Sequence, residues 1–290
     1  MLRKPPLPFR GSKNLWFKEF QELIASIEGE EELLFVDVFG GSGLLSYWIK
    51  QIKPRSTVIY NDFDNYKERI EHVKDTEDLR KIIYPLIDKN KKGRNDALPA
   101  AVVEQIKQIL SEAVFVDVPT WSSWLCFSAR KCNSKEELLA EKKYYPRVPK
   151  FPLDVEHIKQ YLNGISIVCF DASEPEQFIN NLKLDLKKKI YYVLDPPYLY
   201  TETSSYSSNI AKEWFDLQAS VKLFYYFIHH LNVILFSSEK SGLIETYNTF
   251  CCLYDKPEDV IDTSNIIYKL TPGGCKAYQQ QEFMLSAIEQ

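Results

Sequence analysis

The chain has 290 residues, of which 45% are hydrophobic and 26% are charged, and its formal net charge at pH 7 is −4. This composition excludes a disordered chain and is enough for one sizeable core with a small inserted domain. No stretch approaches the ~20 apolar residues that a membrane-spanning helix needs, and the first residues lack the apolar run of a signal peptide. We therefore expect a soluble, cytoplasmic protein.

The cysteines and histidines do not follow a metal-binding pattern. None of the six cysteines forms a Cys-x-x-Cys pair, and the four histidines are scattered. Zinc sites built from these residues need short, regular spacings. The sequence therefore predicts reduced thiols and no bound metal.

The first part of the chain predicts the start of a parallel α/β sheet. An apolar strand over residues 33–39 leads into four residues that include three glycines, a helix follows over residues 44–52, and a second strand covers residues 57–61. This order of strand, glycine loop, helix and strand is typical of doubly wound α/β domains.

The alternation of strands and helices stops after residue 62 and resumes near residue 165. Residues 63–164 are charged and mainly helical in pattern, which predicts an insertion. Further strands are expected over residues 165–171, 190–194 and 233–236, a long helix over 211–230, and a final hairpin of residues 266–270 and 282–286. We predict a Rossmann-like α/β core of residues 1–62 and 165–290 that carries an inserted helical region of residues 63–164.

The glycine loop after the first strand is a candidate cofactor site. It reads Asp37-Val38-Phe39-Gly40-Gly41-Ser42-Gly43. Glycines allow a ligand to approach the backbone, and the following helix offers free N–H groups, although an ordinary βα turn has a similar composition and no Walker lysine follows. Asp62 lies at the end of the second strand, about twenty residues later. An acid at this position can accept hydrogen bonds from ribose hydroxyls; the alternative is that it caps a helix. Together these residues favour a cofactor that contains a nucleoside.

The sharpest motif is Asp195-Pro196-Pro197-Tyr198, directly after an apolar strand. An aromatic amine is a weak nucleophile because its lone pair is delocalised. The Asp195 carboxylate and the Pro196 carbonyl could accept both of its N–H groups and favour a pyramidal nitrogen. The two prolines would hold these acceptors still, and Tyr198 offers a face on which an extruded base can stack. A merely rigid turn is the alternative interpretation.

Taken together, these motifs resemble the Dam-like (alpha-class, D12) adenine-specific DNA methyltransferases. The glycine loop comes first, a long insertion separates it from Asp-Pro-Pro-Tyr, and the segment Pro8-Phe9-Arg10-Gly11-Ser12-Lys13 is similar to the N-terminal element of that family. The resemblance covers roughly two thirds of the chain. It implies an AdoMet-dependent methyltransferase sheet and transfer of a methyl group from S-adenosyl-L-methionine to N6 of a flipped-out adenine.

The resemblance also assigns roles to individual residues. Phe9 and Lys13 would contact the methyl donor, and Asp37 together with Phe39, Gly40, Gly41, Ser42 and Gly43 would line its methionine end. Asp62 would hold the ribose and Asp171 would lie near the cofactor adenine. Residues Asp195, Pro196, Pro197 and Tyr198 would hold the target adenine, with Asp195 also next to the donor.

The insertion would then bind duplex DNA. The overall charge argues mildly against nucleic acid unless positive charge is concentrated locally. Local clusters are present, and the expected DNA-binding residues are Lys91, Lys92, Arg94, Lys142, Lys143, Tyr144, Arg147 and Lys150. A solvated charged face is the alternative for each cluster.

Two other functions stay open. An RNA adenine methyltransferase would use the same chemistry, and a non-catalytic DNA-binding relative could keep the fold. The sequence does not say whether a cognate restriction endonuclease accompanies the protein in a restriction-modification pair.

Overall fold

The computed structural model describes residues 1–9, 11–127, 131–196, 217–230, 232–238, 243–253, 266–272 and 279–287. The chain divides into two compact units. The first unit comprises Met1, Lys13–Asp64 and Gly164–Gln290, and the second comprises Leu2–Ser12 and Asn65–Asn163. Residues 2–12, which the sequence grouped with the core, therefore cluster with the second unit.

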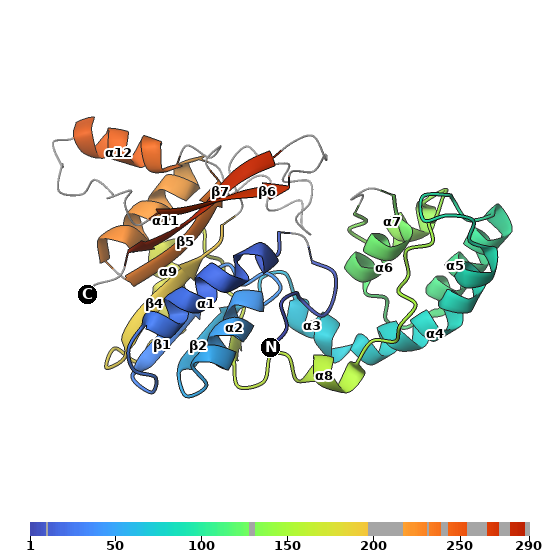
Figure 1. The fold of residues 1–290 in the computed structure, drawn as a ribbon, viewed down its shortest axis with the longest axis horizontal. Coiled ribbons are helices and arrows are strands. Elements are labelled where there is room, and N and C mark those ends of the chain that lie inside the picture. The colour runs from blue at the N-terminus through green and yellow to red at the C-terminus, as the bar shows by residue number, and fades with distance from the viewer. Residues whose placement is uncertain are drawn as a thin grey trace. The chain divides into compact units, whose positions relative to one another are not determined.

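The first unit is built on a seven-stranded sheet in the order β3-β2-β1-β4-β5-β7-β6 (Figure 1). Neighbours among β1 to β5 are parallel, whereas β7 is antiparallel to both β5 and β6. The strands are β1 Leu33–Asp37, β2 Thr57–Asn61, β3 Ser166–Val168, β4 Lys189–Leu194, β5 Asn232–Ser238, β6 Ile266–Pro272 and β7 Gln279–Ala287. This is the Rossmann-like α/β fold expected from the sequence, and the final hairpin is confirmed.

Helices cover both faces of this sheet. They are the 3-10 turn η1 Asn14–Trp16 and helices α1 Phe17–Ser26, α2 Leu44–Ile52, α9 Pro175–Leu182, α11 Leu217–His230 and α12 Leu243–Leu253. The beginning of the predicted helix over residues 211–230 lies outside the described residues. Within those residues, no helix combines the length and the apolar character needed to cross a membrane.

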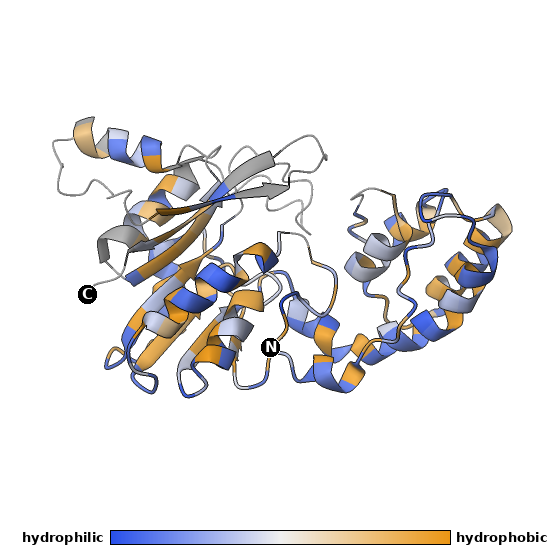
Figure 2. Ribbon diagram, in the orientation of Figure 1, coloured by the Kyte–Doolittle hydropathy of each residue, from blue (hydrophilic) through white to orange (hydrophobic). Residues whose placement is uncertain are grey.

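Strand alternation sends side chains to the two helical layers. From β1, Leu34 and Val36 join the core beneath α9, α11 and α12, whereas Phe35 stacks on Tyr191 of β4 on the opposite face. On that opposite face, Phe20 of α1 contacts both Trp48 of α2 and Phe236 of β5. Figure 2 shows how hydrophobic residues concentrate on the strands. The central strands are buried on both faces, as parallel strands usually are.

The second unit is helical and has its own core. Its helices are α3 Tyr66–Glu71, α4 Val73–Asn90, α5 Ala100–Glu112, α6 Val118–Leu125, α7 Lys135–Ala140 and α8 Val155–Lys159. Apolar residues of α4 to α7 meet in one cluster, which includes Ile83, Ile106 and Trp121. Asp117 and Ser134 accept backbone N–H bonds at the starts of α6 and α7.

The N-terminal segment is fixed to the second unit by polar contacts. The Tyr66 hydroxyl lies 3.1 Å from both the N and the O of Leu7. Arg69 donates to the Pro8 carbonyl at 2.8 Å and to the buried Asp117 carboxylate at 2.9 Å. These contacts explain why residues 2–12 cluster with α3 and α6 rather than with the sheet.

Candidate functional site

The carboxyl ends of β1, β2 and β4 meet at one edge of the sheet. β1 lies between β2 and β4, so the loops that follow these strands leave side by side. The connection reverses direction between β1 and β4, and ligands of open α/β sheets bind at such a switch point. Asp37, Asp62 and Asp195 stand at or directly after the ends of these three strands.

The glycine loop after β1 needs its glycines for two different reasons. A Cβ on Gly40 would lie 2.1 Å from the ring of Tyr60, so any side chain there would clash with β2. Gly41 and Gly43 have φ angles of 51° and 68°, a conformation that other residues avoid. The loop therefore lies flat against β2 and delivers Gly43 as the N-cap of α2.

Tyr60 joins the glycine loop to the acid after β2. Its hydroxyl lies 2.7 Å from the Gly41 carbonyl and 2.8 Å from Oδ1 of Asp62. Burial, and then the charge of Asp62, raises the pKa of Tyr60 well above 10.0, so the hydroxyl stays protonated and donates. Asp62 is 5% exposed, and the next residue, Phe63, is 42% exposed. An acid and an aromatic ring thus follow β2, but the sequence prediction included only the acid.

Asn61 is a structural residue that the sequence prediction missed. Its amide nitrogen donates to the carbonyls of Val38 and Phe170 at 3.0 and 2.9 Å, and its oxygen accepts the backbone N–H of Phe170 at 2.8 Å. It therefore ties together the segments that follow β1 and β3. An Asn as the last residue of a strand, before the acid, was the available signal.

Asp37 is a buried acid with one oxygen left for a ligand. Its Oδ2 accepts a hydrogen bond from Ser46 of α2 at 2.7 Å, whereas its Oδ1 has no hydrogen-bond partner among the described residues. Burial raises the pKa of Asp37 to about 7, despite the bond from Ser46. A buried acceptor without a partner is costly, so this atom points to a donor group that arrives with a ligand.

Lys13 and Asp195 form the central ion pair of the site. The Lys13 ammonium lies 2.6 Å from Oδ2 of Asp195, and their side chains are 8% and 16% exposed. Burial raises the pKa of Asp195 to about 6, although the charge of Lys13 acts in the opposite direction. The same ammonium stands 5.9 Å from the ring centre of Phe236 on β5. The structure thus brings together two predicted site residues that are far apart in the sequence.

The other predicted core residues have separate positions. Phe39 is half-buried against the sheet core, and Ser42 is buried. Asp171 is exposed, and its Oδ1 accepts the backbone N–H of Ser173 at 2.8 Å, which explains it as a turn residue. Pro196 is buried after Asp195. Pro197 and Tyr198 lie outside the described residues.

Phe9 belongs to the second unit, where its ring packs edge-on against Tyr66 with centroids 5.7 Å apart. The part that it would play at the donor stays a prediction.

The structure corrects one predicted DNA-binding residue. Tyr144 is fully buried in the core of the second unit, and its hydroxyl donates to the Leu138 carbonyl at 2.7 Å. It cannot stack on a base without leaving that core. The alternation of Lys142, Lys143 and two tyrosines suggested a surface, but only the lysines are exposed there.

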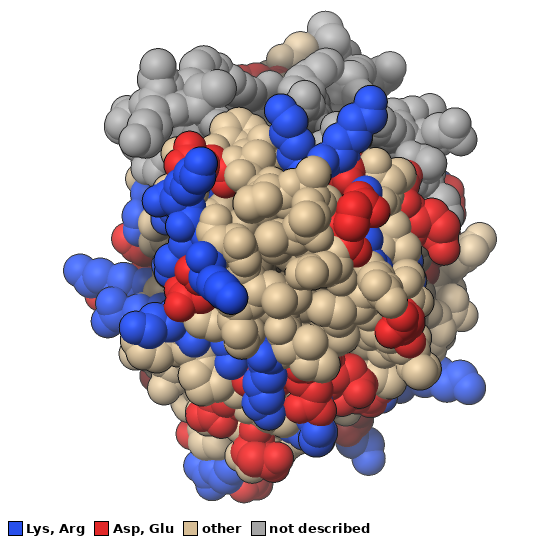
Figure 3. Space-filling view, turned by 90° about the vertical axis from the view of Figure 1, so that its right-hand side faces the viewer, with Lys and Arg blue, Asp and Glu red and all other residues tan. Residues whose placement is uncertain are grey.

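The remaining basic residues on the predicted DNA-binding list differ in their surroundings. Lys91, Lys92, Arg94 and Lys150 are all exposed, and Lys91 also forms an ion pair with Asp88. In Figure 3, blue and red side chains alternate around a broad uncharged area, so this face carries both signs rather than one basic patch.

Arg147 is part of an aromatic cluster that the sequence prediction missed. Its guanidinium carbon lies 5.1 Å from the ring centre of Phe127 and 5.7 Å from that of Tyr145. The two rings are 5.0 Å apart, and Phe127 is 49% exposed. Phe127, Tyr145 and Arg147, here called the aromatic–arginine cluster, place an accessible ring beside a cation.

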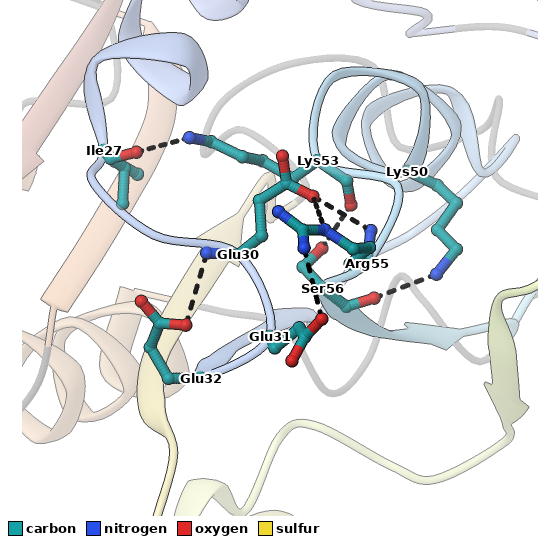
Figure 4. Close-up of polar contacts among 8 residues, drawn as sticks. All are labelled: Ile27, Glu30, Glu31, Glu32, Lys50, Lys53, Arg55 and Ser56. Carbon is teal, nitrogen blue, oxygen red and sulfur yellow. Dashed lines mark hydrogen bonds and ion pairs between the residues drawn. The ribbon is translucent and has the colours of Figure 1, made fainter.

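A second polar cluster lies at the other end of the strands, before the amino ends of β1 and β2 (Figure 4). It surrounds a depression of about 490 Å³ that is lined by Gly29, Glu30, Glu31, Glu32, Lys53 and Arg55. Arg55 pairs with Glu30 at 3.2 Å and with Glu31 at 3.3 Å, and Lys53 donates to the Ile27 carbonyl. These contacts join the loops that precede β1 and β2, so we interpret the cluster as structural.

Comparison with known proteins gives the family. No family model matches the chain. The chain is 36% identical over 254 residues to a protein of Haemophilus influenzae described as "Putative methyltransferase", and the match covers 85% of this chain and 79% of that protein. The similarity extends over most of both proteins and agrees with the sheet order and the glycine loop. The chain therefore belongs to the same methyltransferase family as the Haemophilus influenzae protein.

Proposed function

We propose that the protein is an S-adenosyl-L-methionine-dependent DNA methyltransferase that acts on N6 of an adenine rotated out of the duplex. The observation that carries the proposal is the position of Asp195. It follows β4, next to the strand that bears the glycine loop and Asp37, and Lys13 holds one of its oxygens at 2.6 Å.

The residues at the sheet edge fit the proposed methyl donor. S-adenosyl-L-methionine carries an ammonium, a ribose and a purine, and when bound it supplies an electrophilic methyl group on a sulfonium. Oδ1 of Asp37 has no partner in the described part of the chain and can accept a donor N–H or O–H, and Asp62 is placed to accept hydrogen bonds from ribose hydroxyls. Phe63 offers an exposed ring beside that acid. The site is also rich in carboxylates, which favours a cationic ligand.

The chemistry assigned to Asp195 follows from its two oxygens. Lys13 engages Oδ2, so we assign Oδ1 to the exocyclic amine of the adenine. The carbonyl of Pro196 would accept the second N–H, which localises the nitrogen lone pair towards the methyl group. Fixed acceptors of this kind accelerate a reaction mainly by positioning and by their preorganised charges. The amine becomes acidic once it is methylated, and its proton then passes to Asp195 or to water.

The structure changes the role that we assign to Lys13. The resemblance placed this residue in contact with the methyl donor, whereas here its ammonium contacts Asp195. We propose that Lys13 keeps Asp195 ionised and correctly oriented. Its contact with the donor stays a prediction.

The second unit would supply the DNA contacts. The aromatic–arginine cluster replaces Tyr144 in the proposal, because an exposed ring next to a guanidinium can stack on an unpaired base or wedge into a base step. The exposed lysines Lys142 and Lys143 precede Tyr145 in the chain and are placed to neutralise phosphates.

A labelled-methyl assay tests this function. Purified protein would be incubated with methyl-labelled S-adenosyl-L-methionine and, in parallel, with duplex DNA, single-stranded DNA, RNA and protein. We expect incorporation into duplex DNA, recovered as N6-methyladenine by mass spectrometry of the nucleosides, and its loss in Asp195→Asn. Incorporation into RNA or protein alone would refute the proposed substrate, and absence of transfer to every substrate would favour a non-catalytic relative.

A further inference from the structure

The C-terminal hairpin holds the segment that carries Lys13. β6 and β7 form this hairpin, and β7 pairs with β5 (Figure 1). Glu282 of β7 lies opposite Lys269 of β6 in the ladder. The Lys269 ammonium contacts Glu19 of α1 at 2.8 Å, and Glu282 contacts Trp16, the last residue of η1. Two neighbouring strand positions therefore bind the η1–α1 segment.

Trp16 connects Glu282 to the backbone of Lys13. The indole N–H of Trp16 donates to Oε2 of Glu282 at 3.2 Å, and its backbone N–H donates to the Lys13 carbonyl at 2.8 Å. The indole is 1% exposed and meets the ring of Phe236 edge-on, with centroids 5.7 Å apart. Because the turn between Lys13 and Trp16 is short and its tryptophan is fixed, the Lys13 side chain leaves from a defined point.

We infer that Glu282 is a positioning residue for methyl transfer: it fixes Trp16, and through the η1 turn it sets the Lys13 ammonium against Asp195. Glu282 is expected to touch neither donor nor substrate. The inference rests on the proposed function, because it gives Glu282 a part in the reaction assigned to Asp195.

The charge of Glu282 has an effect separate from its hydrogen bond. Among the described residues, the charged groups that face Asp195 are Lys13 before η1, Glu282 on β7 and Asp37 at the end of β1. Lys13 lowers the pKa of Asp195, whereas Glu282 raises it. Removing the negative charge while keeping the hydrogen-bond acceptor should therefore lower the pKa of Asp195 and leave Trp16 in place.

Three variants separate the two effects. Glu282→Gln keeps an oxygen acceptor and removes the charge, Glu282→Leu removes both, and Trp16→Phe removes the N–H donor together with one ring of the indole. We expect Glu282→Gln to keep kcat within about threefold and to move the acid limb of its pH profile to lower pH. We expect the other two variants to lose about tenfold in kcat, the order of one buried hydrogen bond to a charged group. Glu19→Gln is the matched control, since it removes the same charge from an acid that contacts Lys269 of the hairpin rather than Trp16.

The readouts distinguish this inference from the proposed function. Circular dichroism and thermal melting would confirm that each variant is folded, and kcat and KM would be measured on duplex DNA between pH 5 and 9. Wild-type activity on DNA tests the proposed function. In parallel, the ¹³C carboxyl titration of Asp195, assigned with Asp195→Asn, reports its surroundings whether or not methyl transfer occurs. Wild-type kcat and an unchanged Asp195 titration in folded Glu282→Leu and Trp16→Phe would overturn the inference.

Discussion

Asp37→Asn should stabilise the protein and weaken binding of the methyl donor. The Asp37 carboxyl is fully buried, with one oxygen bonded to Ser46 and the other without a partner among the described residues. The amide can still accept the Ser46 hydrogen bond. The substitution removes the charge whose burial is unfavourable. If the amide oxygen keeps the Ser46 bond, the amide nitrogen takes the place of the unpaired Oδ1.

The magnitude follows from the pKa of Asp37. Burial raises this pKa from 3.8 to about 7. A pKa that is higher in the folded protein means that the folded state binds the proton more tightly. Stability is therefore full below the ordinary pKa and falls as pH rises through the folded value. A shift of about three units corresponds to at most about 4 kcal/mol of lost stability above pH 7. A neutral amide accepts the Ser46 hydrogen bond more weakly than a carboxylate does, which offsets ~1 kcal/mol, so we expect a net gain of about 2–3 kcal/mol in the variant.

The assay is denaturant unfolding at a series of pH values between 4 and 8. The difference between variant and wild type should be small near pH 4, grow towards pH 7 and then level off. At pH 8 the gain corresponds to roughly 5 °C in Tm for a chain of this size. Asp171→Asn is the control, because Asp171 lies at the same sheet edge with an exposed carboxyl. By calorimetry, S-adenosyl-L-methionine should bind Asp37→Asn about 10–100-fold more weakly, the order of one charged hydrogen bond. The reasoning would be refuted if the free energies of unfolding of variant and wild type differed by the same amount at every pH, or if the affinity for S-adenosyl-L-methionine were unchanged.

Three further outcomes are expected. Asp195→Asn should fold normally and lose at least ~10³-fold in kcat, because positioned acceptors of this kind contribute that order. In the wild type, kcat should decrease at pH values below the Asp195 pKa of about 6, where the carboxylate takes up a proton, and a pH–rate profile checks this. Gly40→Ala should destabilise the protein by about 1–3 kcal/mol, since its Cβ would meet the neighbouring tyrosine ring at 2.1 Å; thermal melting against Gly93→Ala, whose Cβ would meet only a movable carboxylate, measures this effect. Phe127→Ala should weaken DNA binding about tenfold in fluorescence anisotropy if its ring stacks on a base, whereas Phe151→Ala, which removes an even more exposed ring, should not.

The sequence predicted the first unit well because its strands are short apolar runs with clear ends. The bounds of α2 and β2 are those predicted, since a glycine, a proline and an acid delimit them. The rhythm of strands and helices was less informative for α1. Its buried Phe20 and Ile24 have helical spacing, but the helix precedes the first strand and so belongs to no strand–helix–strand unit.

The residues of the site were easier to predict than the network between them. Lys13 and Asp195 were both expected from motifs, but no local pattern shows that residues so distant in sequence form an ion pair. Glu282 acts through contacts made across the fold, so its type and spacing carry little signal, whereas Asn61 could be suspected only from its place at the end of a strand. Tyr144 was misplaced for a related reason: alternating lysines and tyrosines look alike whether a tyrosine covers a surface or fills a core.

The attachment of residues 2–12 to the helical unit has a practical consequence for protein engineering. An exchange of the helical unit between relatives would naturally transplant one continuous piece, residues 65–163. Such a graft would separate Tyr66 and Arg69 from the backbone of Leu7 and Pro8, and it would leave the Arg69 guanidinium without one of its bonds. A chimera that keeps its stability must therefore exchange two pieces of chain together, the short leading segment and the long internal one.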